Sequence, residues 1–252
     1  MPLRPIPLIA GNWKMNGVTA ALAEAEALAT LVATHGVARG GEVALCPPAT
    51  LLMAMRERLG RSGIATGGQD CHARASGAHT GDISAAMLKD AGARFVIVGH
   101  SERRADHGET DEAVREKAAA AVATDLIPIV CVGETESQRL SGEAVRVVER
   151  QLDGSIPDGV PTEGIVIAYE PVWAIGTGLT PTLADIAEMH EAIRRRLVER
   201  FGEGGHSVRI LYGGSLKPGN AREILAVDNV DGGLVGGASL LAKDFFAIIS
   251  AL

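Results

Sequence analysis

The sequence Ala168-Tyr169-Glu170-Pro171-Val172-Trp173-Ala174-Ile175-Gly176-Thr177-Gly178 ends one predicted strand and starts a loop. The apolar run over residues 164–168 is typical of a buried strand. Because proline cannot continue a central strand, Pro171 predicts that the chain leaves the sheet directly after Glu170. An indole and two closely spaced glycines follow, which suits a loop whose backbone approaches a ligand. We interpret Glu170 as a candidate general base beneath a closing loop; a solvated glutamate before an ordinary turn is the alternative.

Short apolar runs with the character of buried strands alternate with longer amphipathic stretches along the whole chain. Eight strands are expected, over residues 7–10, 43–46, 64–66, 95–98, 127–131, 165–169, 208–212 and 233–235. Strands that alternate with helices imply a parallel sheet, and eight such units close it into a barrel. The predicted fold class is therefore α/β, a (β/α)8 TIM barrel formed by a single domain over residues 1–252. A doubly wound sheet of six strands with two additions is the alternative.

The amphipathic stretches between the strands predict helices over residues 20–34, 109–124, 143–152 and 183–200. Two runs of charge fall within these helices, at residues 111–117 and at Arg194-Arg195-Arg196. We interpret both runs as solvated helix faces.

Composition narrows the class of protein. The chain of 252 residues is 46% hydrophobic and 22% charged, which provides for a large core and argues against disorder. Its formal net charge of −7 argues against a surface for nucleic acid or for anionic membranes. A site for an anionic substrate therefore needs local positive charge, which lysines and backbone N–H groups can supply.

The three cysteines Cys46, Cys71 and Cys131 are irregularly spaced, and no CxxC or HExxH pattern occurs. We therefore expect no metal site, and reduced thiols in a cytoplasmic protein. The apolar run over residues 6–10 is short and broken by proline, which predicts neither a secretory signal nor a membrane span.

Polar side chains stand at the ends of several predicted strands, where a parallel barrel builds its active site. Asn12 and Lys14 follow the first strand, His100 and Glu102 follow the fourth, and Glu170 follows the sixth. A lysine, a histidine and a glutamate that converge on one barrel mouth favour an acid–base site over three independent accidents.

Two glycine pairs follow the last two strands, Gly213-Gly214 before Ser215 and Gly236-Gly237 before an alanine. Plain turns are one interpretation, but barrels often bind phosphate at this position, which we favour. No P-loop and no complete GxGxxG after a strand is found, so a dinucleotide cofactor is not expected. Residues 99–103 lack the second glycine of a nucleophile elbow, so a serine hydrolase is unsupported.

Seven motifs in chain order resemble those of the triosephosphate isomerase family, over essentially the whole sequence. They lie at residues 11–16, 99–104, 131–134, 168–173, 174–178, 212–215 and 234–239. The resemblance implies an isomerase of glycolysis and gluconeogenesis that interconverts dihydroxyacetone phosphate and D-glyceraldehyde 3-phosphate. It also implies an enediol(ate) intermediate and no cofactor.

By the same resemblance, Glu170 transfers the proton between the two carbons, and His100, as a neutral imidazole, hydrogen-bonds the substrate oxygens. Lys14 supplies positive charge, Asn12 a hydrogen bond, and both bind substrate. Glu102 pairs with Lys14, with a direct proton relay as the less favoured role. The expected phosphate donors are the N–H groups of Gly176, Ser215, Gly236 and Gly237.

Family members are generally dimers in which the loop after the third strand enters the partner. We therefore expect a homodimer, with Thr80 reaching the region of the partner's Asn12. His79 and Asp82 replace a common aromatic residue and a common glutamate of this loop. We expect this difference to weaken the apolar contact and to make association sensitive to pH.

The hinge Leu179-Thr180-Pro181 also departs from the family pattern. In the family, a tyrosine hydroxyl, here that of Tyr212, bonds the N–H of the third hinge residue in the closed state. Proline has no N–H, so we predict that this bond is missing and that Ser215 bonds Gly178 instead.

Two other classes stay open on the sequence alone. Another phosphate-binding barrel enzyme, such as an aldolase or epimerase, needs a Schiff-base lysine or metal ligands that the chain does not convincingly present. A non-catalytic barrel would have no reason to keep Glu170, His100 and Lys14 together.

Overall fold

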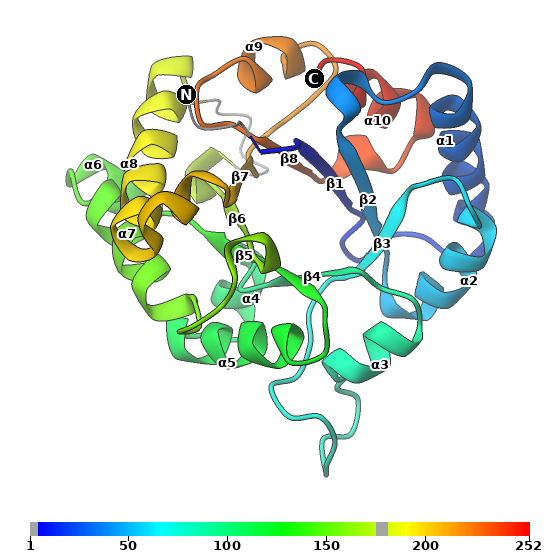
Figure 1. Ribbon diagram of the computed structural model, residues 1–252, viewed down its shortest axis with the longest axis horizontal. Coiled ribbons are helices and arrows are strands. Elements are labelled where there is room, and N and C mark those ends of the chain that lie inside the picture. Colours follow the sequence, from blue (N-terminus) through cyan, green and yellow to red (C-terminus); the bar gives the residue numbers. More distant parts are fainter. Residues whose placement is uncertain (1–4, 175–180) are drawn as a thin grey trace.

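The structure is a computed structural model that describes residues 5–174 and 181–252. Its strands are β1 (Leu8–Asn12), β2 (Glu42–Cys46), β3 (Ala65–Gly68), β4 (Phe95–Val98), β5 (Ile127–Val132), β6 (Val166–Tyr169), β7 (Arg209–Tyr212) and β8 (Gly232–Val235). They run parallel and close into a barrel in chain order, because β1 pairs with both β2 and β8 (Figure 1). The (β/α)8 barrel predicted from the sequence is confirmed. The alternative of an open doubly wound sheet is wrong, because the barrel has no sheet edge.

Helices surround the barrel as an outer ring (Figure 1). They are α1 (Leu22–His35), α2 (Ala49–Leu59), α3 (Ala85–Asp90), α4 (Ser101–Asp106), α5 (Asp111–Val122), α6 (Glu136–Leu140), α7 (Ala144–Ser155), α8 (Leu183–Phe201), α9 (Ala221–Leu225) and α10 (Ala242–Ile249). The four helices expected from the sequence correspond to α1, α5, α7 and α8. Among the helices of the described ranges, none combines the length and apolar character that a membrane crossing requires.

Side chains of alternating direction on the strands fill two apolar regions. In β1, Leu8 and Ala10 belong to the cluster inside the barrel, whereas Ile9 belongs to the cluster between strands and helices. Both faces of each strand are buried, which explains why the strands are continuous apolar runs in the sequence. Because side chains fill the interior, the loops at the carboxyl ends of the strands are left to form a site.

One side chain of the arginine run in α8 is buried, contrary to the sequence interpretation. Arg194 donates to Asp231 at 2.6 Å and to the carbonyl oxygens of Gly205 and Val208 at 2.6 and 2.7 Å. Arg195 is exposed and Arg196 half-buried, and both pair with acidic side chains of α7, as expected for a solvated face. The helical period explains the difference, because Arg194 lies one residue after the buried Ile193 and on the side of α8 that faces the barrel.

We predict that Arg194→Met lowers the free energy of unfolding by about 3–5 kcal/mol, because the buried Asp231 carboxylate then loses its ion pair with Arg194. Arg195→Met, which removes an exposed charge from the same helix, is expected to cost less than about 1 kcal/mol. Urea unfolding followed by circular dichroism measures both. Equal losses in the two variants would show that the Arg194 contacts contribute no more than a surface pair.

Candidate functional site

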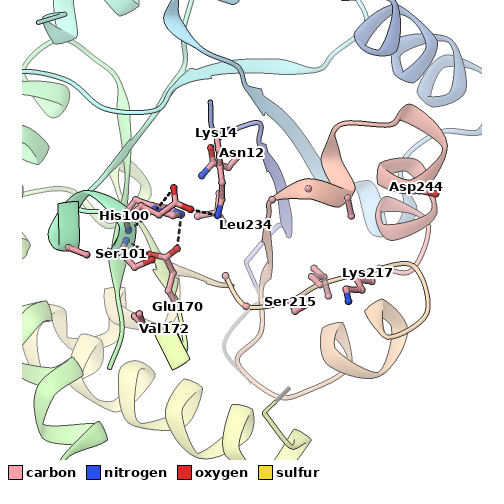
Figure 2. A pocket seen from close by; sticks show the side chains of 18 of the residues that line it. Asn12, Lys14, His100, Ser101, Glu170, Val172, Ser215, Lys217, Leu234 and Asp244 are labelled. Carbon is pink, nitrogen blue, oxygen red and sulfur yellow. Dashed lines mark hydrogen bonds and ion pairs between the residues drawn. The ribbon is translucent and has the colours of Figure 1, made fainter. Parts of the chain in front are cut away.

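A cavity of about 790 Å³ opens at the carboxyl ends of the strands (Figure 2). Its lining includes every predicted site residue that the structure describes: Asn12, Lys14, His100, Glu102, Glu170, Ser215, Gly236 and Gly237. These residues come from loops after β1, β4, β6, β7 and β8, so barrel closure brings together segments that lie far apart in the sequence. The predicted phosphate donor Gly176 and the hinge residues Leu179 and Thr180 lie outside the described residues.

His100 stands at the turn between β4 and α4. Gly99 makes that turn with a φ of +66°, and a Cβ on Gly99 would lie 2.6 Å from Val114. The Nδ1 atom of His100 accepts the N–H of Glu102 at 3.2 Å, so the imidazole proton is on Nε2. This Nε2 lies 2.9 Å from Oε1 of Glu170 and donates to it. His100 therefore presents a hydrogen-bond donor to the cavity.

Glu170 is buried, and both of its carboxylate oxygens have partners. Besides the contact with His100, its Oε2 accepts the N–H of Ser101 at 2.9 Å. Burial alone opposes ionisation, but His100 and the Ser101 N–H outweigh it and hold the pKa of Glu170 below its ordinary value. The base is thus ionised before substrate arrives. Ser101, which contributes only its backbone, was not predicted from the sequence as a site residue.

The contact that lowers the pKa of Glu170 raises that of His100. Burial opposes protonation of His100, but the Glu170 and Glu102 carboxylates raise its pKa above the ordinary value. The resemblance to the family implies a neutral ring at the start of α4, and the contact with Glu170 opposes that effect here. A second proton, on Nδ1, would also have to break the hydrogen bond from the Glu102 N–H.

Two glycines leave room for Glu170. A Cβ on Gly133 would lie 1.8 Å from the carbonyl oxygen of Glu170, and one on Gly213 would lie 2.9 Å from its Cγ. Under 3 Å, a real side chain forces the backbone or its neighbours to move. Gly133 follows β5 and lies within the motif at residues 131–134, but its role as the glycine that admits Glu170 cannot be predicted from the sequence, because Glu170 follows a different strand.

Lys14 has the left-handed backbone conformation, with a φ of 53° that is unusual for a residue other than glycine. Its N–H donates to Oδ1 of Asn12 at 3.0 Å, and Nε2 of Gln69 donates to its carbonyl oxygen at 2.8 Å. The same Nε2 also donates to the carbonyl oxygen of Cys46 at 2.9 Å. Strain of this kind costs about 1–3 kcal/mol and persists only where the surroundings enforce it. Gln69, which is not among the site residues predicted from the sequence, is one of the groups that enforce it.

The ammonium of Lys14 lies 2.6 Å from Oε1 of Glu102. This is the ion pair predicted from the sequence. Figure 2 shows Lys14 and Asn12 on the same side of the cavity as His100, with the lysine nitrogen directed toward His100 and Glu170. Positive charge is thereby held next to the candidate acid–base pair.

The loop that follows Glu170 is anchored at its start. The indole Nε1 of Trp173 donates to Oε1 of Glu134 at 2.8 Å, and the hydroxyl of Tyr169 donates to the same oxygen at 3.1 Å. The guanidinium of Arg139 lies over the Trp173 ring, 5.0 Å from its centre, and donates to Asp185 of α8 at 2.5 Å. Contacts from α6 thus hold both the residues before the undescribed segment and the helix after it.

The family model described as triosephosphate isomerase matches residues 7–252. The chain belongs to the triosephosphate isomerase family. Membership of this family identifies the chain as an isomerase. The alternatives of an aldolase, an epimerase or a non-catalytic barrel therefore have no support.

Triosephosphate isomerases from several bacteria are similar to this chain over almost its whole length. The triosephosphate isomerase of Afipia carboxidovorans is 60% identical, covering 100% of this chain and 99% of that protein. The triosephosphate isomerase of Rhodopseudomonas palustris is 59% identical, with 98% of each chain covered. The crystal structure of the Bartonella henselae triosephosphate isomerase superposes with a TM-score of 0.91 at 48% identity, covering 98% of each chain.

We predict that the carboxyl of Glu170 titrates below the ordinary glutamate pKa of about 4.3. Because its pKa is lowered on folding, its contacts stabilise the folded chain at neutral pH, and this stability is lost as pH falls through the lowered pKa. In His100→Leu the main lowering contact is gone, so burial dominates and the titration moves to higher pH. NMR titration of the carboxyl carbon measures both. His107→Leu, which changes an exposed histidine after α4, serves as the control, and a midpoint unchanged in His100→Leu would contradict the assignment.

Proposed function

We propose that this chain interconverts dihydroxyacetone phosphate and D-glyceraldehyde 3-phosphate by proton transfer through an enediolate. The reaction belongs to glycolysis and gluconeogenesis. One observation carries the proposal: the ionised carboxylate of Glu170 touches the Nε2–H donor of His100 at the cavity floor, at 2.9 Å. A base beside a hydrogen-bond donor is what removal of a proton next to a carbonyl requires.

In the proposed reaction Glu170 takes a proton from the carbon next to the ketone of dihydroxyacetone phosphate. The electrons of that bond form the carbon–carbon double bond, and the negative charge goes to the carbonyl oxygen. His100 Nε2–H donates to this oxygen as charge develops. Glu170 then returns the proton to the neighbouring carbon, and a proton exchanged between the two oxygens completes the aldehyde.

The resting contacts of Glu170 bear on its strength as a base. To reach substrate, the carboxylate leaves the Nε2–H of His100 and the Ser101 N–H, which lower its pKa together with the more distant charge of Lys14. Burial remains and favours the protonated form, so the carboxylate becomes a stronger base at the moment it meets the carbon acid. His100 is released at the same time to bind the substrate oxygens.

We assign the remaining roles as follows. Lys14 provides fixed positive charge to the enediolate, held by Glu102, and Asn12 hydrogen-bonds substrate. The phosphate rests on backbone N–H groups, each hydrogen bond to the charged group contributing about 1.5–3 kcal/mol. These donors are those of Gly176, Ser215, Gly236 and Gly237.

A homodimer is the proposed assembly, with the loop between β3 and α3 entering the partner subunit. Figure 1 shows this loop projecting away from the barrel. A second cavity of about 320 Å³, lined by Lys14, Met15 and Gln69 among others, lies beside the catalytic lysine and suits such a loop. Met15 is 97% exposed, an unusual state for a large apolar side chain outside an interface. Thr80 is the loop residue proposed to approach the partner's Asn12.

We also propose that residues 1–252 form one domain that acts in the cytoplasm. The family model spans residues 7–252, and the barrel closes between its first and last strands. Three buried cysteines without disulfides are consistent with a reducing compartment.

We expect Glu170→Ala to lower kcat for D-glyceraldehyde 3-phosphate by about 10²- to 10⁴-fold, the range for loss of a general base. Binding of the phosphate is left intact, so KM should change little. A coupled assay of isomerisation measures both constants, and Glu163→Ala, at an exposed glutamate before β6, is the control. A variant that keeps most of its activity would show that another group is the base.

The loop proposed to dock carries two histidines whose rings are in contact. The rings of His72 and His79 have centres 3.9 Å apart, and Nε2 of His72 lies 3.8 Å from Oδ2 of Asp82. Protonation of both rings places like charges against each other within the loop.

The dimer is therefore expected to be weaker at about pH 5.5 than at about pH 8. Analytical ultracentrifugation gives the dissociation constant at each pH. His79→Phe removes one member of the pair and should lose most of this dependence. If the dependence is absent in the unmodified chain, the histidine pair does not control association.

A further inference from the structure

The charges that line the large cavity oppose the substrate that we assign to it. Two lysines, Lys14 and Lys217, face four carboxylates in the lining, those of Glu102, Asp106, Glu170 and Asp244. The chain as a whole carries a net charge of −7. A phosphate dianion therefore approaches a negatively charged protein through a negatively charged mouth, and association of like charges is slow unless a local cation intervenes.

Lys14 is poorly placed to act as that cation. Its ammonium is 2.6 Å from Oε1 of Glu102, so the pair presents little net charge to an anion at a distance. It also lies at the catalytic side of the cavity, together with His100 and Glu170 (Figure 2). Its charge acts once substrate is in contact, not while substrate is approaching.

Lys217 has the opposite properties. Its side chain is exposed at the cavity lining, and its ammonium forms no ion pair with any carboxylate in residues 5–174 and 181–252. It follows Ser215 by two residues, and Figure 2 shows it beside Ser215, across the cavity from His100 and Glu170. This is the end of the cavity where the loops after β7 and β8 meet and where we place the phosphate.

The backbone at Lys217 is fixed even though its side chain is exposed. The N–H of Lys217 donates to Oδ1 of Asn220 at 2.8 Å, and Nδ2 of Asn220 donates to the carbonyl oxygen of Ser215 at 2.9 Å. One asparagine thus holds the cation and the proposed phosphate donor in a constant relation. An exposed lysine is ordinarily only a solvated charge. Lys217 differs from other exposed lysines because its backbone is held beside the proposed phosphate donor Ser215.

We propose that Lys217 is a capture residue, which draws the phosphate dianion of the substrate to the Ser215 end of the cavity. It compensates for the surrounding carboxylates, including Asp244 in the same lining, and it leaves Lys14 free to stay paired with Glu102 until substrate is seated. The inference rests on the proposed function for the identity of the substrate. Lys217 acts on binding and not on the transfer of the proton.

The test compares Lys217→Gln with Lys243→Gln. Lys243 is an exposed lysine of α10 that is not part of the cavity lining, so the two variants change the net charge equally. At low ionic strength Lys217→Gln should lower kcat/KM for D-glyceraldehyde 3-phosphate by about three- to tenfold, with kcat unchanged. The deficit should shrink near 1 M salt, where the screening length falls to about 3 Å. Lys243→Gln should have the kcat/KM of the unmodified chain. Lys217→Arg, which keeps the positive charge, should have that value too.

Each outcome either supports or overturns the capture role of Lys217. Equal loss in both glutamine variants, no loss in Lys217→Gln, or a loss confined to kcat would overturn the capture role. Affinity for inorganic phosphate, measured by calorimetry, separates this inference from the proposed reaction. If the unmodified chain does not isomerise the substrate but Lys217→Gln still weakens phosphate binding about threefold or more, the proposed function fails and the capture role stands. If turnover is normal and phosphate affinity is unchanged in Lys217→Gln, only the capture role fails.

Discussion

The first two N–H groups of α4 organise the catalytic side of the cavity. The N–H of Ser101 binds the Glu170 carboxylate, and the N–H of Glu102 binds Nδ1 of His100. Helix starts leave such donors without partners inside the helix, so they are available to fix other groups. Here one helix start holds the candidate base and also selects which nitrogen of the imidazole carries the proton. The short contact between Glu170 and His100 follows from these two hydrogen bonds.

This arrangement depends on backbone positions that tolerate no ordinary side chain. Gly99 turns the chain from β4 into α4, and Gly133 lies against the carbonyl oxygen of Glu170. Lys14 has a strained backbone conformation, and its ammonium lies beside Glu102. The barrel provides the rigidity that makes this possible, because closure between β1 and β8 fixes the relative positions of all the loops. Local strain is concentrated where the chemistry is, and the apolar core elsewhere compensates for it.

Much of this could be predicted from the sequence, for identifiable reasons. Buried parallel strands are continuous apolar runs, and polar residues at their ends, such as Lys14 and Glu170, stand out against them. The short helices α3, α4, α6 and α9 were missed because five or six residues give too little periodicity. Arg194 was assigned to the solvated face because the run of three arginines was interpreted as a unit instead of by helical period.

Other features were beyond reach because they depend on contacts between remote segments. Gln69 holds the Lys14 backbone through an ordinary side-chain amide, and Ser101 acts through its main chain. Neither a glutamine nor a serine at these positions predicts such a role from the sequence. Barrel register and the close approach of Gly133 to β6 likewise appear only when the strands are in place.

The double attachment made by Arg139 has a consequence for protein engineering. This side chain lies over Trp173 on one side and bonds Asp185 on the other, so one residue of α6 holds both Trp173 and the start of α8. These two positions can therefore serve as fixed ends for loop exchange. Sequences from relatives with a different hinge can be inserted between the same two ends, and differences in turnover can then be attributed to the inserted residues and not to a change in the scaffold.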